Sequence, residues 1–163
     1  MRTQKNKYIL KTKNIAYYSG TTAINLYSSK NTGDWHAVET IKAINSGNSK
    51  SPYFLVGNKR EVNTIPYLGM HGIINCESIL KGMGADPKQK YKLAANHYRA
   101  VADMVLWSAL NNKSLDFIAI NDWMVKKTDR QKVYSLLKTS YKKLGINTAR
   151  IIKIWIKKAE ESN

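Results

Sequence analysis

A long amphipathic helical pattern in the middle of the chain places the strongest limit on its fold. Apolar residues recur at helical spacing from about residue 88 to residue 112, whereas Lys92, Asn96, Arg99 and Asp103 fall on the other face. The sequence therefore predicts one long helix that packs its apolar face on the rest of the chain and turns these polar side chains to solvent.

Short runs of β-branched and aromatic residues predict strands on both sides of this helix. They lie at residues 7–11, 14–18, 53–56 and 115–120. The first two runs are close enough in sequence to pair as a hairpin. Shorter helices are expected over 36–44, where Asp34 stands as the N-cap, and over 76–83, which Gly84 closes.

Two helices are expected at the C-terminus, joined by a tight turn. Asp129 stands at the N-cap of the first helix, Gly145 makes the turn, and the second helix runs over 148–161. Together the patterns predict an α+β fold: a small N-terminal antiparallel sheet packed on a long central helix, with a C-terminal helical hairpin.

Length and cysteine content limit the class of protein. A chain of 163 residues is the size of one domain, so we expect residues 1–163 to fold as a single unit. The only cysteine, Cys76, excludes an intrachain disulfide framework and favours a reducing compartment. No apolar run approaches the roughly 18 residues of a membrane span. We therefore expect a cytoplasmic protein with no membrane partner.

The charge of the chain indicates the class of its partner. It has 27 Lys and Arg against 11 Asp and Glu, a net charge of +16. The excess is concentrated in a strand-rich part, residues 1–60, and in the hairpin, residues 113–163, whereas the helical scaffold between them, 61–112, is nearly neutral. Two basic ends predict polyanion binding at both of them. The abundance of Lys, Asn and Ile is typical of AT-rich genomes, and we expect a phage or other mobile element as the source.

The C-terminal segment 137–158 resembles the helix-turn-helix proteins in its core spacing. The matching apolar positions are Leu144 before the turn glycine, Ile146 after it, and Ile151 and Ile154 facing the first helix. One departure is Tyr141, which stands where the family has a small residue. In that family the second helix lies in the major groove of DNA.

The resemblance implies that the polar and basic residues around the second helix contact nucleic acid. The site residues expected from it are Lys138, Lys142, Lys143, Asn147, Thr148, Arg150, Lys153 and Lys157. The alternative for this segment is an ordinary helical hairpin whose lysines are solvated.

The N-terminal segment resembles the opening of the GIY-YIG nucleases. Asn6-Lys7-Tyr8 and Tyr18-Ser19-Gly20 stand where that family has its two tyrosine motifs, although Asn6 replaces a glycine and Lys30 replaces the usual Arg. The resemblance implies metal-dependent attack of water on a phosphodiester, with Mg²⁺ as the cofactor. The catalytic residues that it implies are Tyr8, Tyr18, Lys30, His36 and Glu77. The alternative is a hairpin whose tyrosines pack on a helix.

These observations lead us to expect a protein that binds DNA or RNA through both basic ends and needs no cofactor or metal. Two alternatives stay open: a small nuclease that uses Mg²⁺, and an inhibitor that docks on a nucleic-acid-processing complex. Aromatic residues of the basic N-terminal third would favour unpaired bases, provided that they are exposed. They are Tyr17, Tyr18, Tyr27, Trp35 and Tyr53.

Overall fold

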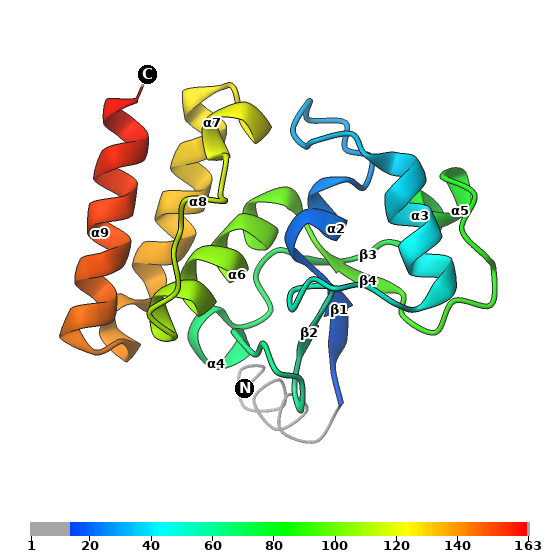
Figure 1. The fold of residues 1–163 in the computed structure, drawn as a ribbon, viewed down its shortest axis with the longest axis horizontal. Coiled ribbons are helices and arrows are strands. Elements are labelled where there is room, and N and C mark those ends of the chain that lie inside the picture. Colours follow the sequence, from blue (N-terminus) through cyan, green and yellow to red (C-terminus); the bar gives the residue numbers. More distant parts are fainter. Residues whose placement is uncertain (1–13, 163) are drawn as a thin grey trace, which may run out of the picture.

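The computed structural model describes residues 14–162, and its strands form one mixed sheet (Figure 1). The strands are β1 (Ala16–Tyr18), β2 (Leu55–Gly57), β3 (Ile73–Asn75) and β4 (Leu93–Ala95), in the order β2-β1-β4-β3. The α+β class is confirmed. The purely antiparallel sheet is wrong, because β1 and β4 run parallel with Tyr18 opposite Ala94. The long connection between them leaves room for the crossover that parallel strands require. The predicted strand 7–11 lies outside the described residues.

Helices make up most of the remaining framework of residues 14–162. They are α2 (Gly20–Ile24), α3 (Ala37–Ser46), α4 (Ile65–Leu68), α5 (Glu77–Gly82), α6 (His97–Leu110), α7 (Ile120–Trp123), α8 (Lys127–Ser140) and α9 (Ile146–Glu161), with a 3-10 turn, η1 (Tyr141–Lys143), between the last two. Figure 1 shows α6 in the middle, between the sheet on one side and α8 and α9 on the other. None of these helices combines the length and the apolar composition that a bilayer crossing requires.

The central helix α6 is shorter than its sequence pattern suggested. It begins after Asn96, whose side-chain oxygen accepts a hydrogen bond from the backbone N–H of Arg99 and so caps the helix. The predicted start near residue 88 is wrong, because Leu93–Ala95 pair with two strands as β4. Most residues of α6 are buried, including polar ones, so the helix has no solvent face of the kind that the pattern indicated.

Arg99 and Asp103, predicted to face solvent, form a fully buried ion pair. Their side chains are 0% exposed, with Arg99 Nε 2.7 Å from Asp103 Oδ1. Hydroxyl groups of Tyr17, Ser19 and Thr64 donate to the same carboxylate. Arg99 Nη1 donates to two backbone carbonyls, of Gly69 and His71, at 2.8 Å each. The prediction failed because two polar residues one helical turn apart give the same sequence pattern in both situations. They can face solvent, or they can be buried in a network in which every polar group has a hydrogen-bond partner. Replacing Arg99 is therefore expected to destabilise the fold strongly, whereas replacing a solvent-facing arginine would have little effect.

Two local predictions are also corrected. Residues 115–120 form no strand, although Ile118 and Ile120 are buried, because a short apolar run packs on a core equally well as irregular chain. Helix α3 begins at Ala37 and not behind an Asp34 cap, since His36 occupies the N-cap position. The helix continues past residue 44 to Ser46, and Gly47 ends it in the left-handed region at a φ of 67°.

Burial of Val105 gives a direct test of how α6 packs. Its side chain is 0% exposed inside the main apolar cluster. Val105→Asp is expected to lower the free energy of unfolding by several kcal/mol, because a carboxylate would lose its hydration without gaining a partner. Val38 of α3 is 62% exposed, so Val38→Asp is the matched control and should melt like the parent. Thermal melts that shift equally in both variants would contradict this packing.

His97, at the start of α6, is buried and has both ring nitrogens occupied. Nε2 lies 2.9 Å from the carbonyl of Leu26, and Nδ1 lies 2.6 Å from Oγ1 of Thr32. A carbonyl only accepts, so Nε2 carries the proton and Nδ1 accepts from the Thr32 hydroxyl. Burial lowers the pKa of His97, which keeps the ring neutral.

This lowered pKa predicts a loss of stability on mild acidification. As the pH falls below about 6.5, unfolded chains take up a proton at His97 before folded chains do, and the free energy of unfolding decreases until the folded pKa is passed. Urea unfolding at a series of pH values measures the effect. The slope should disappear in His97→Gln and persist in His71→Gln, whose side chain is exposed. A slope that survives in His97→Gln would place its origin elsewhere.

Candidate nucleic-acid interface

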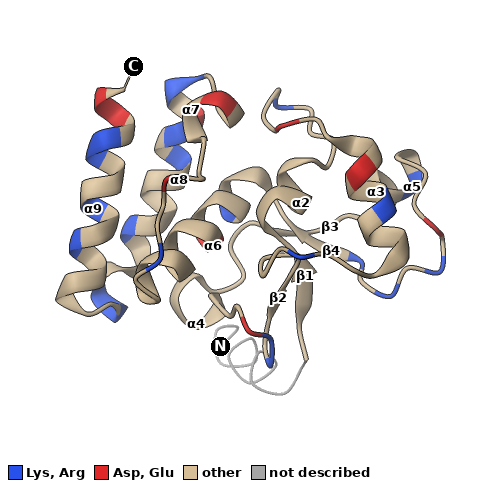
Figure 2. Ribbon diagram, in the orientation of Figure 1, with Lys and Arg blue, Asp and Glu red and all other residues tan. Residues whose placement is uncertain are grey.

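The C-terminal hairpin carries a long stretch of chain with basic residues and no acidic ones. From Gln131 to Ala159 there are eight Lys and Arg and no Asp or Glu. All eight side chains are exposed: Lys132, Lys138, Lys142, Lys143, Arg150, Lys153, Lys157 and Lys158. Figure 2 shows them along α8, α9 and the connection between these helices, with acidic residues only near the opposite end of the hairpin. We call these eight residues the basic hairpin surface.

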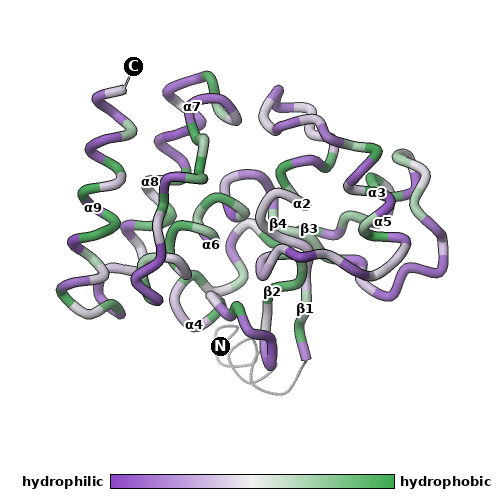
Figure 3. The backbone as a smooth tube through the Cα atoms, viewed as in Figure 1, coloured by the Kyte–Doolittle hydropathy of each residue, from purple (hydrophilic) through white to green (hydrophobic). Residues whose placement is uncertain are grey.

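Helix α9 separates its apolar and basic sides. Ile152, Trp155, Ile156 and Ala159 are buried at helical spacing against the core. Figure 3 shows the corresponding alternation of hydrophobic and hydrophilic residues along the helix. The predicted inward packing of Ile146 and Ile154 is wrong, because they are 86% and 45% exposed. The apolar stripe is centred one residue away from the predicted one, so both isoleucines turn outward among the cations.

Helices α8 and α9 pack antiparallel along their length. Gln131 Nε2 donates to Glu160 Oε1 near the open end, the rings of Tyr134 and Trp155 meet edge to face further along, and Lys153 lies over the Tyr141 ring near the turn. The predicted helical hairpin is confirmed. This antiparallel packing differs from the arrangement in helix-turn-helix proteins, where the two helices meet at about 90–120°. The role of α9 in reading a groove stays a prediction.

The start of α8 also differs from its prediction. Lys126 occupies the N-cap position and Asp129 lies in the first turn. The Asp129 carboxylate accepts hydrogen bonds from Lys132 and from the hydroxyl of Tyr98 on α6, and both bonds lower its pKa. Asp129 therefore joins α8 to α6 instead of capping the helix.

The predicted nucleic-acid-binding residues differ in what they contact. Asn147 is exposed and Thr148 is half-buried. The ammonium of Lys143 donates to the carbonyls of Pro66 and Tyr67 in α4, at 3.1 and 3.2 Å, and Lys157 lies 3.7 Å from Glu161.

Within the described residues, three cations of this group contact neither a carboxylate, nor a backbone carbonyl, nor an aromatic ring. Within residues 14–162, no carboxylate lies within 4.0 Å of Lys138, Lys142 or Arg150. These residues are therefore the readiest to neutralise a phosphate.

The predicted nuclease residues that the structure describes have no hydrogen bond or ion pair with one another. Tyr18 is buried, and burial raises its pKa to about 12; its hydroxyl lies 3.4 Å from Gln89 Oε1. His36 lies beside Asp34, and Glu77 lies 3.3 Å from Lys92. Lys30 is exposed, and Tyr8 lies outside the described residues. No group of three His, Cys, Asp or Glu among the described residues is placed to hold a metal ion.

The sequence did not distinguish exposed aromatic residues from buried ones. Tyr17, Tyr18 and Tyr53 belong to the core, whereas Tyr27 and Trp35 are 53% and 51% exposed. The polar loop between Tyr27 and Trp35 was the only sequence signal of their exposure. Tyr17 and Tyr18 lie in a strand of the same third of the chain and are buried.

Comparison with known proteins leaves the family open. No family model, curated protein or solved structure matches this chain.

Proposed function

We propose that this protein binds nucleic acid through the basic hairpin surface. The observation that carries the proposal is the run of eight exposed cations without an acidic residue from Gln131 to Ala159. A surface that mixed both signs would leave little net field. Here the fields of neighbouring cations add to one another. When nucleic acid binds, their ammonium and guanidinium groups take the place of the counterions condensed on its phosphates.

Arg150 is suited to more than phosphate contact. It is the only exposed Arg among these eight residues, and a guanidinium can form the paired hydrogen bonds that recognise a guanine edge or a phosphate. The rest of the surface is lysine, a point charge that carries little sequence information. Binding is therefore expected to depend mainly on charge. The second predicted basic end, residues 1–60, has five of its ten cations outside the described residues.

Salt dependence tests this proposal. Fluorescence anisotropy of labelled single-stranded DNA, duplex DNA and single-stranded RNA should give affinities that fall steeply between about 50 and 200 mM salt, with a log–log slope near −0.9 for each duplex phosphate contacted and near −0.7 for a single strand. Binding and cleavage of each probe are measured on the same samples, with and without magnesium. Affinity that stays flat with salt for every probe would reject the proposal, and magnesium-dependent cleavage would revive the nuclease alternative.

A further inference from the structure

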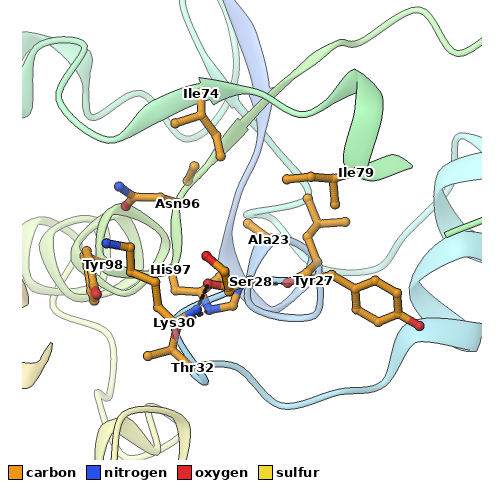
Figure 4. Close-up of a pocket in the computed structure, with 13 residues that line it drawn as sticks. Ala23, Tyr27, Ser28, Lys30, Thr32, Ile74, Ile79, Asn96, His97 and Tyr98 are labelled. Carbon is orange, nitrogen blue, oxygen red and sulfur yellow. Dashed lines mark hydrogen bonds between the residues drawn. The ribbon is translucent and has the colours of Figure 1, made fainter. Parts of the chain in front are cut away.

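A pocket lies where the parallel strand β4 passes into α6. Its volume is about 300 Å³, near the lower end of the range for ligand sites. Leu26, Ile74 and Ile79 form its apolar lining, and Lys30, Asn96 and His97 are among its polar residues. Figure 4 shows the Lys30 side chain extending toward Asn96, with the two isoleucines across the pocket. In open α/β sheets, ligands bind beyond the carboxyl ends of parallel strands, which is where this pocket opens.

The wall of the pocket is fixed before any ligand arrives. Both nitrogens of His97 are engaged by the loop that follows α2, through Leu26 and Thr32. Gly33 permits this approach: it has a φ of 123°, and a Cβ there would lie 2.9 Å from the His97 ring. His97 is thus a positioning residue that holds the loop carrying Lys30 against α6.

Two exposed aromatic rings stand beside the pocket. Tyr27 lines it, and the Tyr27 and Trp35 ring centroids are 6.3 Å apart with planes tilted by 40°. Trp35 has a φ of 63°, a left-handed conformation that is unusual for a bulky residue and that accompanies its exposure. Partly exposed rings in a basic protein are the platforms on which unpaired bases stack.

The charge around the pocket suits an anion. None of the residues that line it is acidic, and Lys30 supplies an ammonium group. Tyr98, on another wall, accepts a hydrogen bond from Lys132 at 3.1 Å and donates one to Asp129 at 3.0 Å, and the Lys132 ammonium lies 4.8 Å from its ring. Lys132 belongs to the basic hairpin surface, so the pocket and that surface meet at Tyr98.

We infer that this pocket accepts one unpaired nucleotide of a single strand whose backbone continues onto the basic hairpin surface. The inference rests on the proposed function. The base lies against the apolar lining, its phosphate pairs with Lys30, and the next base stacks on Tyr27 and Trp35. A duplex does not present a base in this way, so the pocket gives a preference for single strands.

Paired variants test the pocket. Tyr27→Ala should weaken binding of a single-stranded DNA oligonucleotide by about tenfold, the loss of one stacked base, and leave duplex affinity unchanged. Phe117→Ala is the matched control, because Phe117 is 48% exposed and stacks on Tyr53 at 6.2 Å. Lys30→Ala should reduce the single-strand salt slope by about 0.7, and the exposed Lys50→Ala should leave it unchanged. A purine-analogue fluorophore in the strand should be quenched by the parent and not by Tyr27→Ala.

The outcomes separate the pocket from the proposed function. Equal losses on single strands and duplexes, or no loss in Tyr27→Ala and Lys30→Ala while hairpin variants still weaken binding, would overturn the pocket alone. Absence of binding to every nucleic acid would overturn the proposed function and the pocket with it. Titration with AMP is the remaining arm: tight binding of AMP, with single-strand affinity unchanged in Tyr27→Ala, would assign the pocket to a free nucleotide and also overturn the inference.

Discussion

Replacing Asp103 with asparagine is expected to lower the free energy of unfolding by about 3–5 kcal/mol, the cost of removing one partner from a buried ion pair. The Arg99 guanidinium would stay charged and fully buried, with two carbonyls but no counter-charge. The hydroxyl groups of Tyr17 and Ser19 would lose their carboxylate acceptor at the same time. Burial alone raises the pKa of Tyr17, so its phenol is a poor replacement for the lost negative charge.

Urea denaturation followed by circular dichroism measures this loss. Asp122→Asn is the control, because it removes the same charge from an exposed position. It should change stability by a few tenths of a kcal/mol at most. Should Asp103→Asn unfold at the same urea concentration as this control, the network would contribute no stability and its role would have to be sought elsewhere.

Removing three unpaired cations of the basic hairpin surface together is expected to have the largest effect on binding. In the triple variant Lys138→Ala, Lys142→Ala and Arg150→Ala, the log–log salt slope measured with duplex DNA should become less steep by about 2.7, about 0.9 for each phosphate that the variant no longer neutralises. Stability should hardly change, because all three side chains are exposed. Anisotropy titrations at several salt concentrations give the slope, and a thermal melt checks the fold.

A control with equal charge distinguishes a located surface from net charge. Lys42, Lys50 and Lys81 are exposed and lie outside the hairpin. Changing these three to alanine removes the same total charge and should alter the slope by much less. If both triple variants lose affinity to the same extent, binding depends on overall charge and the hairpin has no special part in it.

The sequence was sufficient where one physical signal dominated. Gly145 between two helical patterns predicted the hairpin, and the exposure predicted for Arg150, Lys153 and Lys157 is confirmed. It was insufficient where a residue's surroundings come from distant segments. Arg99 looks like a solvated residue until Tyr17 and Thr64 supply its other partners, and no local pattern reports them.

The same limit applies to short elements and to the pocket. A strand of three residues, Leu93–Ala95, gives too weak a sequence signal to be recognised beside a long helical pattern. Only its pairing with β1 and β3 identifies it as a strand. Tyr18 and Tyr27 have the same side chain and lie in the same basic segment, yet Tyr18 is buried in the core and Tyr27 is exposed at the edge of the pocket. Tyr18 is buried because it lies in β1 of the sheet, whereas Tyr27 is exposed because it lies in the loop after α2.

The parallel pairing of β1 with β4 has a consequence for synthesis of the chain. During translation, β1 and β2 emerge first and can pair at once, but the other edge of β1 waits until Leu93–Ala95 have left the ribosome. Over that interval the nascent chain presents an open strand edge, the feature that most readily recruits a foreign strand. Arg99 and Asp103 leave the ribosome shortly after β4, so the sheet can close and the buried ion pair can form at the same stage of synthesis.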